Sequence, residues 1–283
     1  MKEKTTHVKC GSCGSQSNSL VTQEDEWKIV KCRVCGFVYV NPQPCEEFLK
    51  RHYQGYLPQT QIGIDAWGNM MSWVFDVSWR MLKKFCGSQR PVRSLDIGCG
   101  HGFFLQKAKR EGWCASGIDL SEQAVRYAIS KGLDASNSTL FEKKYKDGEF
   151  DVVTMFYVLE HVPDPASYLQ EVYRILKPQG VLLLRVPDTT PIVKILKVFK
   201  IPNKLYDAPS HLSDFSSHTI KKMLIKTGFS EVRTVIGGMT FPAKIGECFI
   251  SCVCGGVALL LEAITFGKYL LPGVSKTTIA RKL

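Results

Sequence analysis

A short apolar segment that breaks into three closely spaced glycines constrains the fold of this chain more than any other feature. Residues 92–97 have the apolar spacing of a buried strand, and residues 103–109 have helical spacing. Gly98, Gly100 and Gly102 lie between them. Glycine suits such a turn because it adopts positive φ and lets the backbone approach a ligand without a Cβ. This order is typical of an α/β sheet that binds a nucleotide-like cofactor.

The glycine spacing separates this loop from the dinucleotide-binding fingerprint. That fingerprint would place its third glycine at position 103, where this chain has Phe103. Asp96 precedes the loop, and a second carboxylate, Asp119, ends a short apolar segment further along the chain. A carboxylate in this second position suits a ribose diol, which offers two hydroxyl donors.

The loop at 96–102, Asp-Ile-Gly-Cys-Gly-His-Gly, resembles the cofactor loop of class I S-adenosylmethionine-dependent methyltransferases. Further elements follow in that family's order: the strand ending at Asp119, an apolar strand at 150–155, the segment Val-Leu-Glu-His-Val-Pro-Asp-Pro at 158–165, a helix at 168–176 and a strand at 181–186. The resemblance covers about residues 92–240. It implies an α/β, Rossmann-like fold with a seven-stranded, mostly parallel sheet and helices on both faces.

The resemblance also assigns cofactor contacts position by position. Asp96 would lie near the ammonium group of S-adenosylmethionine, and Asp119 would accept its ribose hydroxyls. Ser138 lies in a segment where many relatives carry an acidic residue for the adenine. The residues expected at the cofactor are Asp96, Gly98, Cys99, Gly100, Gly102, Asp119, Leu120, Ser138, Met155 and Phe156. Cys99 fits better as a small filler than as a nucleophile, because no activating base lies around it.

Two C-x-x-C-G turns, at 10–14 and 32–36, form the second strong motif. Four thiolates at this spacing are typical of a closed, structural zinc site. The expected ligands are Cys10, Cys13, Cys32 and Cys35. A redox pair or disulfides are the less favoured alternative. So short a segment buries little core, and metal binding would supply the missing folding energy.

These motifs predict three parts: a zinc ribbon at 1–44, a helical lid or linker at 45–90, and an S-adenosylmethionine-binding methyltransferase domain at 91–283 with a helical insertion at about 241–273. The aromatic helix within the second part either folds over the cofactor as a lid or packs on the sheet. Tyr53 and Tyr56 are the better candidates for contact with the site, since they lie in a less regular turn.

The net charge of +11 is concentrated after residue 189. Residues 192–201 alternate lysines with apolar side chains, and residues 248–261 carry no charge. The second segment is too short to span a bilayer. We favour the interpretation that both segments are helices capping the substrate. In the alternative, 192–201 and 248–266 rest on an anionic membrane surface near a lipid-linked substrate.

The N-terminal residues and the cysteines bear on localisation. The first residues lack the apolar core of a secretory signal. Eleven cysteines, an odd number with four in metal spacing, indicate a reducing compartment. We therefore expect a cytoplasmic protein, with any membrane contact at the inner face.

Two histidines are the candidate proton acceptors for methyl transfer, which needs a positioned nucleophile and removal of its proton. His161 follows the strand at 150–155, on the side where the cofactor's methyl group would emerge. His211 lies in Pro-Ser-His-Leu-Ser-Asp-Phe at 209–215, a segment that borders the acceptor pocket in relatives. The alternative for both is a structural role, capping a helix or satisfying a carbonyl.

The segment after the third strand bears on the acceptor. Residues 156–160 lack the Asp/Asn-Pro-Pro-aromatic signature of enzymes that methylate base amino groups, and no Pro-Cys nucleophile is present there. A small-molecule acceptor is favoured, such as a sugar or another hydroxylated metabolite. A ribbon before this core resembles bacterial sugar, polysaccharide and small-molecule methyltransferases. The alternatives are an RNA methyltransferase, using the ribbon and the basic C-terminal face, and a non-catalytic cofactor-binding module.

Overall fold

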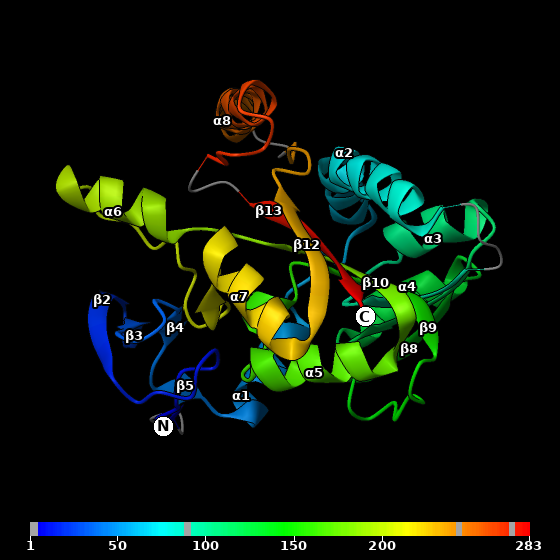
Figure 1. Cartoon of the computed structure of the whole chain (residues 1–283), viewed down its shortest axis with the longest axis horizontal. Coiled ribbons are helices and arrows are strands. Elements are labelled where there is room, and N and C mark those ends of the chain that lie inside the picture. The colour runs from blue at the N-terminus through cyan, green and yellow to red at the C-terminus, as the bar shows by residue number, and fades with distance from the viewer. Residues whose placement is uncertain (1–4, 88–91, 242–244, 272–274) are drawn as a thin grey trace.

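The structure is a computed structural model that describes residues 5–87, 92–241, 245–271 and 275–283. A small ribbon sheet, two connecting helices and a large helix-covered sheet follow one another along the chain (Figure 1). The predicted boundary at residue 90 and the predicted end of the insertion at residue 273 lie outside the described residues.

The N-terminal residues form a four-stranded sheet whose last strand comes from a distant part of the chain. The antiparallel strands β2 (Asn18–Glu24), β3 (Trp27–Cys32) and β4 (Val38–Val40) are joined by β11 (Ser213–Asp214), which pairs with β4. A separate pair consists of β1 (Thr5–Thr6) and β5 (Gln43–Pro44). Phe37 and Tyr39 of this ribbon join the main hydrophobic core. The ribbon is therefore packed into the molecule.

Two helices, α1 (Glu46–Gln54) and α2 (Gln61–Cys86), lead from the ribbon to the large sheet. The hydroxyl of Thr60 accepts a hydrogen bond from the N–H of Gly63 and caps the start of α2, and Gly87 ends it with φ 65°. The buried side chains of α2 recur at helical spacing: Ile64, Met71, Val74, Ser78, Trp79 and Leu82. This face packs on the sheet and on α3, where Trp79 and Phe75 contact Phe104.

The large sheet has seven strands in the order β12-β13-β10-β9-β6-β7-β8. They are β6 (Arg93–Ile97), β7 (Cys114–Asp119), β8 (Asp134–Asn137), β9 (Phe150–Phe156), β10 (Leu176–Val186), β12 (Phe229–Val235) and β13 (Lys276–Lys282). The order runs in parallel from β8 to β10, and β13 lies antiparallel to both of its neighbours. The predicted seven-stranded, mostly parallel sheet is confirmed.

Helices cover both faces of this sheet, and the alternation along β10 separates the two cores. Leu182 and Leu184 belong to the core beneath α5 (Pro165–Ile175) and α7 (Ser217–Thr227). Val181 and Leu183 point to the opposite face, beneath α2 and α3 (Phe103–Arg110). A strand with both faces buried explains the continuous apolar run that the sequence shows there. On the α3 side, α4 (Glu122–Ser130) completes the layer.

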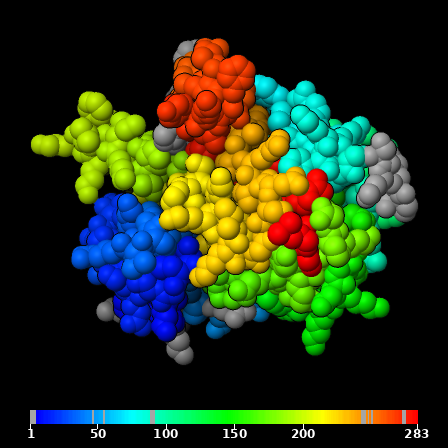
Figure 2. Space-filling model, in the orientation of Figure 1, coloured from blue at the N-terminus to red at the C-terminus, as the bar shows by residue number. Residues whose placement is uncertain are grey.

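Two more helices lie at the periphery. α6 (Thr190–Val198) follows β10 and reaches out from the body, and α8 (Ile245–Ile264) lies above the end of β12 (Figures 1 and 2). No helix within the described ranges combines the length and the apolar character needed to cross a bilayer. The sequence singles out both segments, the lysine-containing apolar segment of α6 and the uncharged apolar segment of α8.

Candidate active site

The glycine loop between β6 and α3 has the positive-φ backbone that the sequence predicts. Gly98, Gly100 and Gly102 all have positive φ, at 72°, 51° and 81°. A Cβ on Gly98 would come within 2.3 Å of a methyl group of Val158, and one on Gly102 within 2.5 Å of a methyl group of Leu133. Conformation and space therefore both require glycine at the ends of the loop.

Two carboxylates flank this loop at the carboxyl ends of β6 and β7. Asp119 accepts hydrogen bonds from the N–H groups of Gly100 (2.8 Å) and Ser121 (2.7 Å). Burial raises its pKa, and these backbone bonds oppose the shift. Asp96 is buried and accepts a 2.6 Å bond from the hydroxyl of Thr154, and burial raises its pKa to about 7. The structure thus brings Asp96, Asp119 and the loop together.

The remaining predicted cofactor residues differ in their surroundings. Cys99 is buried, and burial raises the pKa of its thiol well above the ordinary value, which suits a filler and not a nucleophile. Leu120 is exposed, and Ser138 donates its N–H to the carbonyl of Asp119 at 3.3 Å. Phe156 packs against Phe75 and Phe104. Met155 lies fully buried in the core, so its side chain offers no free surface to a cofactor.

His101 is a polar group in the loop that sequence reasoning missed. Its side chain is buried, and its Nδ1 has no hydrogen-bond partner within the described part of the chain. Burial lowers its pKa, and its ring lies 5.4 Å from that of Tyr127. The one available signal was its position between Gly100 and Gly102, which places any side chain there beside the cofactor loop.

The chain segment 53–58 spans the distance between the loop and the histidines. A methyl carbon of Leu57 lies 3.4 Å from the position that a Cβ on Gly100 would occupy. The rings of Tyr53 and Tyr56 lie edge-on to His161, with centroids 5.2 Å and 5.4 Å away. This segment, here called the tyrosine turn, begins in the last turn of α1 and lies against His161, whereas α2 reaches the candidate site through Phe75, which packs on Phe156.

His161 and His211 lie side by side, although they are distant in sequence. Their ring centroids are 4.9 Å apart. His161 ends a short 3₁₀ turn (Leu159–His161) and its Nδ1 lies 2.7 Å from the carbonyl oxygen of Ser210. Because a carbonyl only accepts, Nδ1 carries the proton and Nε2 is left as an acceptor. Burial, helped by the neighbouring His211, lowers the pKa of His161 to about 4, so the ring is neutral at pH 7.

The buried acid beside these histidines is unusual. Glu160 is completely buried, and neither of its carboxyl oxygens has a hydrogen-bond partner among the described residues. Burial raises its pKa to about 8. Its backbone carbonyl accepts the N–H of Leu212 at 2.7 Å, so the residue also ties the 3₁₀ turn to the His211 segment. The side chain is therefore mainly protonated at pH 7.

The ribbon holds the segment that carries His211. Glu24, at the end of β2, is buried, and its two carboxylate oxygens accept the N–H groups of Tyr206 (2.9 Å) and Ala208 (3.1 Å). The N–H of Val40 donates to the carbonyl of Leu212 at 2.9 Å, in register with the β4–β11 pairing. The ribbon thus holds the backbone on the His211 side of the pair formed by His161 and His211.

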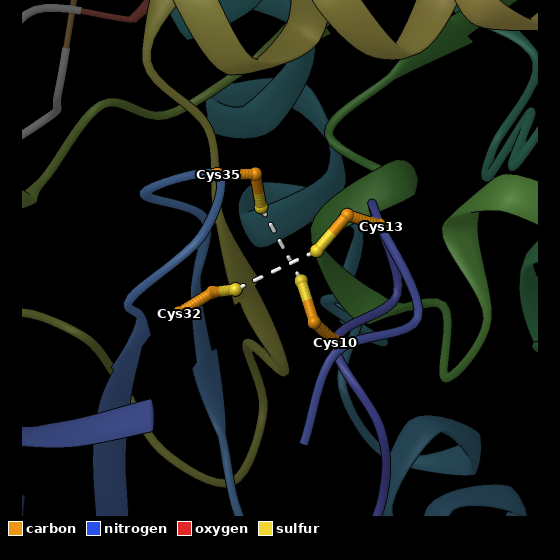
Figure 3. Close-up of side chains that lie close together, drawn as sticks. All are labelled: Cys10, Cys13, Cys32 and Cys35. Carbon is orange, nitrogen blue, oxygen red and sulfur yellow. Dashed lines mark hydrogen bonds between the residues drawn. The ribbon is translucent and has the colours of Figure 1, made fainter. Parts of the chain in front are cut away.

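The four predicted zinc ligands point toward one centre (Figure 3). Cys10 and Cys35 have sulfurs 3.5 Å apart, and Cys13 and Cys32 have sulfurs 3.6 Å apart. A tetrahedron with Zn–S bonds of about 2.3 Å has edges of about 3.8 Å, whereas a disulfide bond is about 2.05 Å long. The cluster therefore fits a zinc ion and contains no disulfide.

Glycines shape both knuckles of this cluster. Gly14 and Gly36 have φ near 80° and return their N–H groups to the carbonyls of Cys10 (2.8 Å) and Cys32 (3.0 Å). This tight reversal is what lets each C-x-x-C pair aim both thiols at one point.

Comparisons with known proteins identify the family of this chain. Residues 74–234 match a family described as a methyltransferase domain. Curated relatives include ubiquinone biosynthesis O-methyltransferases from Xanthomonas oryzae (35% identical over 38% of this chain and 48% of the relative) and Thiobacillus denitrificans (41% identical over 30% and 40%). The chain thus spans about half the length of the curated relatives it matches.

Solved structures share the fold at low identity. Haemonchus contortus phosphoethanolamine N-methyltransferase 2, in complex with S-adenosyl-L-methionine, superposes with a TM-score of 0.54 at 18% identity, over 87% of this chain and 62% of that one. A Thermotoga maritima S-adenosylmethionine-dependent methyltransferase, described as a possible histamine N-methyltransferase, gives 0.53 at 18% identity over 84% and 100%. Together with the family match across more than half of its length, this places the chain in the family of class I S-adenosylmethionine-dependent methyltransferases.

Proposed function

We propose that this protein transfers the methyl group of S-adenosylmethionine to a hydroxyl of a small-molecule acceptor, with His161 taking the hydroxyl proton. The observation that carries the proposal is the fixed tautomer of His161, whose Nδ1–H is held by the Ser210 carbonyl at 2.7 Å. This leaves Nε2 as the acceptor in a neutral ring that adjoins two tyrosines and His211.

The residues around the glycine loop fit the cofactor. Gly98, Gly100 and Gly102 give the loop its positive-φ turn, Asp119 would receive the ribose hydroxyls, and Asp96 would lie near the ammonium group. When bound, S-adenosylmethionine supplies an electrophilic methyl group that needs no further activation. The chain's own task is to hold the acceptor hydroxyl and remove its proton.

The acceptor is best described as a hydroxylated metabolite, such as a sugar. The relatives from Xanthomonas and Thiobacillus are O-methyltransferases by name, which supports oxygen as the methylated atom. The walls formed by Tyr53 and Tyr56 would contact a compact ring and leave its hydroxyl near His161. His211 would serve as a second polar contact for the acceptor.

Zinc would have a structural role in this scheme. The four cysteines complete a tetrahedral shell and leave no open position for a substrate. Residues 1–44 would then form a metal-stabilised ribbon that supports the acceptor side, while 45–90 supplies the tyrosine turn.

The direct test measures transfer of a labelled methyl group from S-adenosylmethionine to a panel of sugars and phenols, for the wild type and for His161→Ala. We expect His161→Ala to lower kcat by about a hundredfold or more, with the affinity for S-adenosylhomocysteine unchanged. His218→Ala, an exposed histidine on α7, is the matched control. Since the pKa of His161 is about 4, wild-type kcat should not fall between pH 7 and pH 5 through this group. Equal losses of turnover and cofactor affinity would assign His161 a structural role, and cofactor binding without any transfer would favour a non-catalytic module.

A further inference from the structure

The outward face of α6 is apolar, and its side chains are exposed. At about 100° per residue, Ile192, Ile195, Val198 and Phe199 fall within an arc of about 120°. Val193, the buried side chain of this helix, lies on the opposite side. Val198 is 78% exposed and Phe199 is 70% exposed. The face that points away from the molecule is therefore the apolar one, the reverse of an ordinary surface helix.

A second uncovered apolar stripe lies along α8. Val253, Val257, Leu260 and Ile264 are exposed and recur at helical spacing. The other face is the one fixed to the protein: Ser251 donates its hydroxyl to the carbonyl of Thr240 at 2.6 Å, and Ala258 is buried. Phe266, just beyond the helix, is 92% exposed. A substrate cap accounts for the inner face of α8 and leaves this outer stripe unexplained.

Both helices start from the edge of the sheet that carries the candidate site. α6 follows the carboxyl end of β10, and α8 comes after the segment 236–241, which follows the carboxyl end of β12. Arg185, buried near the end of β10, fixes that segment by donating to the carbonyls of Ile236 (2.8 Å) and Gly238 (3.0 Å). The glycine loop, Asp119 and His161 also follow carboxyl ends of parallel strands. Both helices therefore begin at the same edge of the sheet as the candidate site.

Positive charge accompanies the apolar face of α6. Lys194 and Lys200 are exposed on and just beyond α6, next to its apolar arc. Lys197 lies toward the ribbon, where it donates to the carbonyl of Val21 at 3.2 Å. The whole chain carries a net charge of +11. Apolar side chains flanked by lysines are the combination that binds the interface of an anionic bilayer.

We propose that the outer faces of α6 and α8 form a docking surface for an anionic phospholipid bilayer. Docked in this way, the protein turns the carboxyl edge of its sheet toward the lipid, with α6 and α8 on the interface. If the proposed function holds, the acceptor hydroxyl reaches His161 from a molecule held in or at the bilayer. Figures 1 and 2 show α6 reaching out from the body at the left of the view and α8 standing at its top.

The test is sedimentation of the purified full chain with vesicles, without cofactor or acceptor. We expect binding to phosphatidylcholine vesicles that contain about a third phosphatidylglycerol, little binding to pure phosphatidylcholine, and loss of binding as salt rises from about 0.05 M to about 0.5 M. Two double variants place charges on the apolar faces. One combines Val198→Glu with Phe199→Glu on α6, and the other combines Val257→Glu with Leu260→Glu on α8. Each should weaken the apparent affinity more than about tenfold. Lys194→Gln and Lys200→Gln should each weaken it about fivefold.

Ile129→Glu is the matched control, because Ile129 is an exposed isoleucine on α4, away from both faces. It should bind vesicles like the wild type. All variants should bind S-adenosylhomocysteine with unchanged affinity, which shows that they are folded. Absence of vesicle binding, or binding that the α6 and α8 variants leave intact, overturns the proposal. Light scattering provides a further test. If the wild type forms dimers that the α8 variant dissociates, and vesicles are not bound, the apolar face binds a second copy of the chain and the membrane proposal is overturned. Neither result bears on methyl transfer, which the labelled-methyl assay tests separately.

Discussion

At the scale of single residues, buried ionisable groups define the candidate site. Glu160 is fully buried with a pKa of about 8, whereas His161 beside it has a pKa of about 4. Burial is the main cause of both shifts, since it disfavours the charged form of either group. At pH 7 the cluster is therefore close to neutral, which keeps Nε2 of His161 available as an acceptor. Burial therefore favours the uncharged forms of both Glu160 and His161.

Glu160→Gln tests this account through the pH dependence of stability. Between pH 4.5 and 8 the folded protein keeps a proton on Glu160 that the unfolded chain has released, so the free energy of unfolding falls as pH rises. The glutamine side chain of the variant cannot ionise, so its fall from pH 5 to pH 8 should be smaller by on the order of 3 kcal/mol. Urea unfolding at the two pH values measures this, with the exposed Glu26→Gln as control. Identical slopes for wild type and Glu160→Gln would rule out a protonated Glu160.

At the scale of secondary-structure elements, the ribbon and the site share one segment. β11 closes the ribbon sheet and closely follows His211, and Glu24 holds the backbone just before it. A carboxylate can accept from both N–H groups at once, whereas an amide would turn its NH₂ group toward one of them. Glu24 is therefore a positioning residue for the acceptor side of the site.

Glu24→Gln should loosen this segment without disturbing the cofactor loop. We expect the amides of 206–214 to exchange hydrogen at least about tenfold faster, and kcat to fall, because a buried N–H loses its partner. Zinc content and affinity for S-adenosylhomocysteine should stay the same. Glu26→Gln, the same change in the exposed turn after β2, should alter none of these quantities. Unchanged exchange at 206–214 would show that Glu24 does not hold the segment.

At the scale of the whole molecule, the ribbon is part of the main core, so zinc should stabilise the entire chain. Cys32→Ser should release the metal and lower the Tm by at least about 5 °C, because the site's binding energy is folding energy. Metal analysis and thermal unfolding measure both effects, and Cys114→Ser, at an exposed cysteine, should leave both unchanged. One zinc per chain retained by Cys32→Ser would refute the four-cysteine site.

Local motifs made much of this architecture predictable. The glycine loop, Asp119 and the two C-x-x-C turns each specify a geometry within a few residues, and the order of strands and helices followed from their resemblance to one family. Contacts between distant segments were not predictable. Three features depend on how distant parts of the chain pack: the hydrogen bonds that Glu24 accepts from Tyr206 and Ala208, the position of His101, and the outward direction of the apolar face of α6. The exposed face of α6 supports the membrane proposal, and the bonds of Glu24 support the prediction for the segment 206–214.

The most direct test of the central claim is calorimetric titration of the full chain with S-adenosylhomocysteine, without acceptor, at low and high salt. We predict micromolar binding that salt hardly changes. Asp119→Ala should weaken it by about tenfold to a hundredfold, since two hydroxyl contacts to a carboxylate are lost, while the exposed Asp134→Ala should not. No binding by the wild type, or equal binding by Asp119→Ala, would contradict a cofactor site at this loop.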